Sequence, residues 1–109
     1  MGRMQRDKGK RGELELAKEV SRLFNCEARR GRQFKGTPDS PDIETSIEGV
    51  QWECKRTEAL SLYPVIEKAI LDSGDDVPVV AHRRSNKPWL VVVRLNDLPC
   101  LVKALKDYT

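Results

Sequence analysis

Residues 50–56 read Val-Gln-Trp-Glu-Cys-Lys-Arg, and this stretch decides how the chain is expected to fold. Apolar and polar residues alternate from residue 50 to residue 55, as in a β-strand that packs one face against a core. The apolar residues then point one way and the polar residues the other, so Glu53 and Lys55 share a face that Cys54 does not. The sequence therefore predicts a strand that presents an acid and a lysine side by side.

A second acid precedes this strand. Asp42 lies in Pro-Asp-Ile at residues 41–43, and a turn at residues 48–49 separates it from Glu53. Carboxylates on two neighbouring strands can hold Mg²⁺, which takes a few carboxylates together with water and phosphate oxygens. Lys55 could then orient an attacking water or neutralise charge on a phosphate. Glu-Cys-Lys alone would favour an ordinary exposed strand, but the added Asp42 and the basic surroundings favour metal-dependent phosphodiester cleavage.

The first helix contributes a third acid. Residues 9–24 show apolar positions at the three-and-four spacing of one helix face, which predicts an amphipathic helix. Glu13 lies on that apolar stripe, whereas Glu15 and Glu19 fall on faces suited to solvent. Glu13 is therefore either a third metal-site group or an acid favoured near a helix N-terminus by the helix dipole.

The remaining segments predict a single α/β domain over residues 1–109, with residues 1–8 as a flexible basic N-terminus. Residues 77–82 and 89–95 are continuously apolar, as in strands covered on both faces. Asn96 or Asp97 is expected to cap a final helix whose apolar stripe covers residues 98–105. The other expected elements are short strands at residues 26–30 and 42–46 and a helix at residues 63–73.

Basic charge is concentrated at the N-terminal end. Residues 1–35 hold eleven Lys and Arg against five Asp and Glu, a net of +6, whereas residues 36–109 hold nine against twelve, a net of −3. Such clusters suit the phosphate backbone of DNA. For Arg3 and Arg6 a solubilising tail is an equal alternative. The predicted DNA contacts are Lys8, Lys10, Arg11, Arg29, Arg30, Arg32 and Lys35.

Several other classes of protein are disfavoured. Three cysteines, Cys26, Cys54 and Cys100, form no disulfide framework or zinc-type spacing and are expected to be reduced packing residues. No segment is apolar enough for a membrane span or a secretory signal, so an intracellular, cytoplasmic location is expected. His82 stands without a catalytic partner pattern and is expected to be non-catalytic.

These residues resemble the PD-(D/E)xK nuclease superfamily, and within it the small archaeal-type Holliday junction resolvases that also occur in phages. The resemblance covers most of the chain, from Lys-Gly-Lys-Arg-Gly-Glu at residues 8–13 through Pro-Asp-Ile and Glu-Cys-Lys to the later apolar strands. It implies a restriction-endonuclease-like core, with a mixed central β-sheet of about five strands flanked by helices. It also implies that Glu13, Asp42, Glu53 and Lys55 are catalytic, and that Mg²⁺, or Mn²⁺ in its place, binds Asp42, Glu53, Glu13 and the Cys54 backbone carbonyl.

The implied function is resolution of four-way DNA junctions by paired symmetric cuts. Two symmetric cuts imply a two-fold homodimer, for which Trp89, Leu90 and residues 98–105 are candidate interface positions, although core packing explains them equally well. The alternatives are another branched-DNA or flap nuclease of the VRR type and a non-catalytic DNA-binding module. A sequence-specific restriction enzyme is less favoured, because the chain has little room for elements that read bases.

The segment at residues 31–40 departs from the compact family members by its length. It contains a second Pro-Asp pair, which makes Asp39 a rival to Asp42 as metal ligand. Asp42 is preferred because Ile43 follows it with strand character, whereas Asp39 reads as loop. The family carries a loop hydroxyl near the scissile phosphate, and Ser40 or Thr37 is the candidate for that role.

Overall fold

The stretch at residues 50–56 forms β3 (Val50–Arg56), the central strand of a five-stranded sheet. The computed structural model describes residues 2–31 and 41–109, with side chains from residue 9 onward in the first range. The other main elements are α1 (Gly2–Phe24), β1 (Ala28–Arg30), β2 (Ile43–Thr45), α2 (Leu62–Ser73), β4 (Val77–Arg83), β5 (Leu90–Val92) and α3 (Leu98–Leu105).

The sheet is mixed, and its strands lie in the order in which they occur along the chain. β3 and β4 are parallel and are joined through α2, whereas every other neighbouring pair is antiparallel. A parallel pair needs such a crossover, because a short hairpin can join only antiparallel strands. The α/β class and the mixed five-stranded sheet predicted from the sequence are confirmed.

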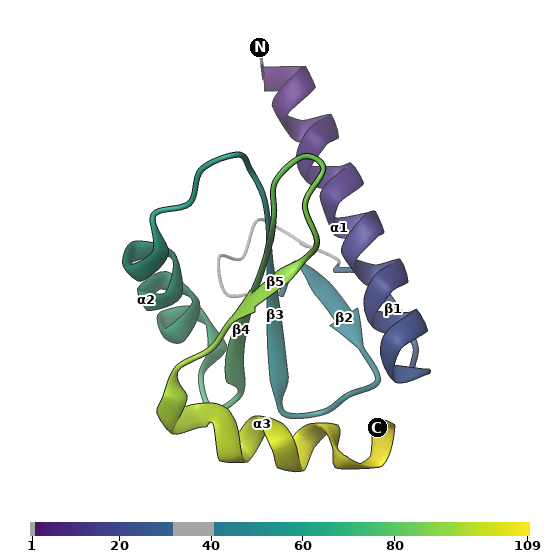
Figure 1. Ribbon diagram of the computed structural model, residues 1–109, viewed down its shortest axis with the longest axis vertical. Coiled ribbons are helices and arrows are strands. Elements are labelled where there is room, and N and C mark those ends of the chain that lie inside the picture. The colour runs from purple at the N-terminus through teal and green to yellow at the C-terminus, as the bar shows by residue number, and fades with distance from the viewer. Residues whose placement is uncertain (1, 32–40) are drawn as a thin grey trace.

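Helices cover both faces of the sheet (Figure 1). The larger core joins α1 and α3 to one face, where Leu16, Trp52 and Leu101 are buried. The smaller core joins α2 to the other face, where Ile66 packs with Val80. β3 contributes Val50, Trp52 and Cys54 to the first face, whereas Gln51, Glu53 and Lys55 point toward α2.

The alternation predicted for β3 is therefore confirmed. Gln51, on the α2 face, donates a hydrogen bond from Nε2 to the carbonyl oxygen of Asp72 near the end of α2, at 3.1 Å. Glu53 and Lys55 line one hollow between β3 and α2, whereas the Cys54 side chain lies on the α1 face near Gly12.

The interpretation of residues 89–95 as a strand covered on both faces is wrong. The strand is the short β5, and Leu90 and Val91 are 60% and 57% exposed. Among the strands that the structure describes, β5 pairs with β4 alone, so it is an edge strand that no described helix covers fully. β4, in contrast, is buried along most of its length, as predicted.

The expected flexible N-terminus is wrong for residues 2–8, because α1 begins at Gly2 and not at residue 9.

Two smaller expectations also fail for physical reasons. Asp97 occupies the N-cap position of α3 but makes no side-chain cap, because its carboxylate accepts a hydrogen bond from Arg94 Nε at 2.7 Å. Glu15 does not simply face the solvent: it forms ion pairs with Arg56 and with Arg83. These pairs tie α1 to the ends of β3 and β4.

Within the part of the chain that the structure describes, no helix combines the length and the apolar character that crossing a membrane requires.

Gly12 allows α1 to lie directly against β3. A Cβ atom at Gly12 would lie 2.6 Å from the Cβ of Arg56 and 3.6 Å from the Cys54 sulfur. Glu13 is the next residue, so the close approach at Gly12 also determines where Glu13 lies relative to the sheet. Gly9, in the same helix, has no atom within 4 Å of such a Cβ.

We expect Gly12→Ala and Gly9→Ala to have opposite effects on stability. Gly12→Ala should lower the free energy of unfolding by about 1–3 kcal/mol, because the added methyl overpacks the contact with β3. Gly9→Ala should raise it by up to about 1 kcal/mol, because alanine favours an exposed helix position. Urea unfolding followed by circular dichroism measures both, and a Gly12→Ala protein as stable as wild type would contradict the close packing.

Candidate active site

Asp42 lies where β2 separates from β3. The last register pair joins Ile43 to Trp52, and the Asp42 backbone N–H donates to the Trp52 carbonyl at 3.1 Å. At the next donor on β3, the Asp42 side chain takes the place of a backbone acceptor from β2. Its Oδ2 accepts a hydrogen bond from the Cys54 N–H at 2.7 Å. Gly31 N–H also donates to the Asp42 carbonyl at 2.8 Å. Asp42 is therefore held by β3 and by Gly31, the residue that follows β1.

Glu53 lies against Asp42. The two side chains share a hydrogen bond, and Gln51 Nε2 donates to Glu53 Oε1 at 3.3 Å. Burial and then the Asp42 carboxylate raise the pKa of Glu53 to about 7 from its ordinary 4.5. The Glu53 carboxyl thus retains its proton until the pH approaches neutrality. A divalent cation can remove the same repulsion, so this pair suits a metal.

Two lysines share the face with Glu53. Glu53, Lys55 and Lys68 line a hollow of about 160 Å³ between β3 and α2. Lys68 Nζ lies 2.7 Å from Asp72 Oδ2, and the pKa of Lys68 is raised by this hydrogen bond first and also by the charges of Glu53 and Asp42. The predicted neighbours Glu53 and Lys55 are therefore together, and α2 adds a second cation.

Glu13 approaches Asp42 from the opposite side of the sheet. Its side chain is 15% exposed and accepts a hydrogen bond from Arg30 Nε at 3.2 Å. Burial and then Asp42 raise the pKa of Glu13, while Arg30 opposes the shift. Glu13 is therefore close enough to Asp42 for the two charges to interact. Glu13 lies on the α1 side of the sheet, whereas Glu53 lies on the α2 side.

Cys54 contributes its backbone to the site. Burial, followed by the Asp42 and Glu13 carboxylates, raises the pKa of its thiol to about 12, so the sulfur is no nucleophile. Since the N–H and C=O of one strand residue point to the same edge, the Cys54 carbonyl is directed toward the edge that Asp42 occupies.

The donor set fits a hard cation that keeps part of its water. Among the residues whose side chains the structure describes, no three His, Cys, Asp or Glu side chains form a ready-made metal cage. Mg²⁺ is usually held by one or two carboxylates plus water and phosphate oxygens, so a cage is not required. Asp42 and Glu53 supply two carboxylates in contact, and the Cys54 carbonyl is directed to the same edge.

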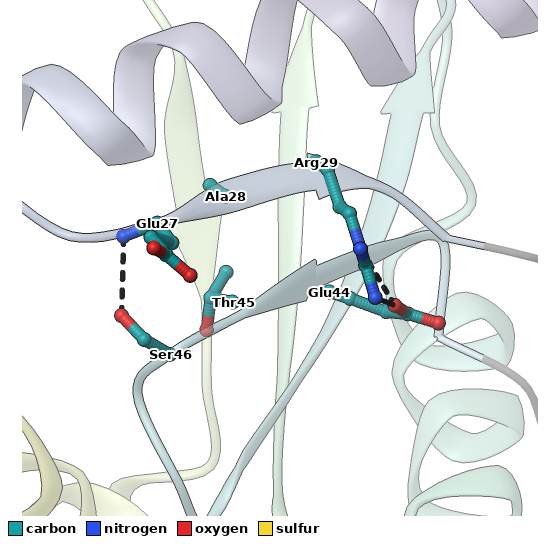
Figure 2. A pocket seen from close by; sticks show the side chains of 6 residues that line it. All are labelled: Glu27, Ala28, Arg29, Glu44, Thr45 and Ser46. Carbon is teal, nitrogen blue, oxygen red and sulfur yellow. Dashed lines mark hydrogen bonds and ion pairs between the residues drawn. The ribbon is translucent and has the colours of Figure 1, made fainter.

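The predicted basic residues near the site are exposed but partly paired. Lys10 and Arg11 are exposed on α1. Figure 2 shows Arg29 reaching from β1 to Glu44 on β2, at 3.0 Å, beside a hollow of about 400 Å³. Arg30 is held by Glu13 on the other face of the sheet. A phosphate that binds Arg29 or Arg30 would have to compete with these carboxylates.

Some of the predicted residues lie outside the described residues. They are Arg32, Lys35, Thr37, Asp39 and Ser40, together with the side chain of Lys8. His82 is described and is tied to the backbone: its Nε2 lies 3.0 Å from the Thr57 carbonyl, to which it must donate because a carbonyl oxygen only accepts.

Sequence reasoning missed three residues of the site. Gln51, Lys68 and Asp72 contact or face Glu53, yet only folding brings α2 across β3. Lys68 and Asp72 stand four residues apart on a predicted helix, which is the spacing of an ion pair. The spacing predicts the ion pair between Lys68 and Asp72, but it does not predict which strand this ion pair faces.

No protein-family model, curated protein or solved structure matches this chain. The function proposed for the site is therefore based on the chemistry of its own residues and on the motifs of the sequence.

The raised pKa of Glu53 predicts how stability depends on pH. Between about pH 4.5 and about pH 7 the folded protein holds a proton that the unfolded chain has lost, so stability should fall as the pH rises through this window. Glu53→Gln should remove that part of the pH dependence, whereas Glu67→Gln on the exposed side of α2 should preserve it. Urea unfolding of the metal-free proteins at about pH 5 and about pH 8 tests this. Equal pH dependence in wild type and Glu53→Gln would contradict the carboxyl pairing.

Proposed function

We propose that the protein is a Mg²⁺-dependent endonuclease of the PD-(D/E)xK superfamily, with a restriction-endonuclease-like core, that resolves four-way DNA junctions. The observation that carries this proposal is the carboxylate pair of Asp42 and Glu53 beside Lys55. Two repelling carboxylates with a neighbouring ammonium group are poorly explained as a stabilising surface pair. They are well suited to phosphodiester hydrolysis.

Different residues of the site would bind the cation, orient the attacking water and neutralise charge on the phosphate. Asp42 and Glu53 would hold the cation together with the Cys54 carbonyl, and Mn²⁺ would substitute for Mg²⁺. Glu13, on the α1 side of the sheet, would add its negative charge beside Asp42. When bound, the ion supplies a Lewis acid that makes water a better nucleophile and stabilises charge on the phosphate. Lys55 would orient the attacking water and neutralise charge on the phosphate oxygens. Gln51 keeps the Glu53 carboxylate in place through its hydrogen bond.

DNA is the substrate class that the charge distribution supports. Lys10, Arg11 and Arg29 are exposed on α1 and β1, the elements around Asp42, and can meet a sugar-phosphate backbone. Cutting a junction at two symmetric points would use a homodimer acting inside the cell. Leu98 and Val102 of α3, 40% and 62% exposed, are the predicted interface positions available to a second copy, whereas Leu101 is buried in the core.

Cleavage assays test the proposal directly. With Mg²⁺, labelled four-way junction should acquire paired symmetric nicks, and chelator should abolish them. Lys55→Ala and Glu53→Gln should each lower the rate by about a hundredfold or more without loss of junction binding, because each removes a group that acts on the reacting phosphate. Lys103→Ala, an exposed lysine of α3, is the matched control.

Other outcomes discriminate the alternatives. Cleavage of flaps but not of junctions would identify a flap or VRR-type nuclease. Binding of junctions with no cleavage in Mg²⁺ or Mn²⁺ would indicate a non-catalytic DNA-binding module and overturn the enzyme proposal.

Thermal shift with Mg²⁺ distinguishes Asp42 from Asp39. At about pH 8, Mg²⁺ should raise the melting temperature of wild type and of Asp39→Asn, because binding to the folded state stabilises it. Asp42→Asn should lose the Mg²⁺ effect, since its amide oxygen can still accept the Cys54 N–H but carries no charge. Loss of the effect in Asp39→Asn alone would assign the ligand to Asp39 instead.

A further inference from the structure

A groove of about 630 Å³ opens between two connections of the chain. One connection joins β3 to α2 and contributes Leu60, and the first residue of α2, Leu62, continues that wall. The other joins β4 to β5 and contributes Pro88, with Leu90 of β5 beyond it. Both connections lie at the end of the sheet toward which β3 and β4 run (Figure 1). We call this feature the connection groove.

The connection groove adjoins the candidate active site. Lys55 and His82 are register partners on the parallel strands β3 and β4, so their side chains lie side by side on one face. Lys55 lines the hollow with Glu53, and His82 lines the connection groove. A DNA strand with its phosphate at Lys55 would therefore meet the groove within the next nucleotide.

The walls of the groove are held by hydrogen bonds. His82 Nε2 bonds the Thr57 carbonyl at 3.0 Å. Glu58 Oε2 accepts from both the N–H and the hydroxyl of Ser85, at 2.9 and 3.0 Å. The two connections are thus tied together, and the groove is a preformed feature of the fold.

The connection groove has a positively charged rim and a largely apolar lining. Arg84 and Lys87 are exposed on the rim. Glu58 also lines the groove, but Arg56 lies 3.9 Å from its carboxylate and Ser85 occupies it with two donors. Arg83 is bound to Glu15 and donates to the Lys87 carbonyl at 2.6 Å, which holds the rim in place.

We propose that the connection groove binds one unpaired nucleotide of the DNA strand next to the cleavage site. The base lies against Leu60, Leu62 and Leu90, and the phosphate meets Arg84 and Lys87. Proteins that extrude a base hold it between aromatic or apolar side chains, and cationic side chains bind the phosphates of the single strand. The groove volume lies within the range of small-ligand sites. This inference rests on the proposed function and adds an unpaired nucleotide at the branch point as a feature of branched DNA that strengthens binding.

Binding in chelator tests the inference without cleavage. The probes are three otherwise identical branched DNAs: one with a single unpaired nucleotide at the branch point, one with an abasic residue at that position, and one fully paired. Wild type should bind the first about tenfold more tightly than the other two, because only the first offers a base to the groove. A fluorescent 2-aminopurine as the unpaired base should also change its emission on binding.

Two sets of variants separate the base from the phosphate. Leu60→Ser with Leu62→Ser should abolish the preference for the unpaired base while leaving affinity for the fully paired DNA unchanged. Arg84→Ala with Lys87→Ala should weaken binding of all three DNAs and reduce the slope of affinity against salt by about one to two. Lys103→Ala with Lys106→Ala, on the C-terminal segment, is the matched charge control. Circular dichroism confirms that each variant is folded.

The outcomes distinguish this inference from the proposed function. Equal binding of the unpaired and abasic DNAs, or an unchanged preference in the leucine variant, would overturn the nucleotide site even if junctions are cut. A preference that depends on these leucines, in a protein that cuts no DNA, would support the groove and reject the nuclease.

Discussion

The hydrogen bond from the Cys54 N–H to Asp42 Oδ2 is the contact on which the candidate site depends. β2 pairs with β3 only as far as Ile43 and Trp52, so the next donor on β3 would have no strand partner. Asp42 supplies the acceptor with its side chain and thereby satisfies a backbone group that burial would otherwise penalise. The same contact fixes a carboxylate beside Glu53. A structural requirement of the sheet thus places an acid where a cation can use it.

The proximity of the two carboxyl groups has an energetic cost. Burial and the charge of Asp42 raise the pKa of Glu53 to about 7, so Glu53 changes between its protonated and its charged form near neutral pH. Such an arrangement weakens folding and favours binding of a cation. Lys55 and Lys68 add positive charge on the same face, where the proposed phosphate would lie. Stability and the proposed chemistry therefore oppose each other at this site.

The two faces of β3 serve different purposes. The apolar face fixes α1, and the contact at Gly12 lets the helix approach closely enough for Glu13 to reach the electrostatic field of Asp42. The polar face meets α2 and continues through His82 into the connection groove. Because β3 and β4 are parallel, their ends and the connections that follow them gather at one end of the sheet. This topology places the proposed substrate surface beside the carboxylates.

The sequence by itself determined β3, its alternation, the limits of α2 and α3 to within a residue, and the shared face of Glu53 and Lys55. Those features are local, because period and turn residues act over a few positions. Only the tertiary structure decided that β5 is an exposed edge, that Glu15 pairs with Arg83, and that Lys68 of α2 faces Glu53. These depend on which element packs against which face. Residues distant in the sequence come into contact when the helices bury their apolar stripes against the sheet. A local sequence pattern does not specify which helix packs on which face.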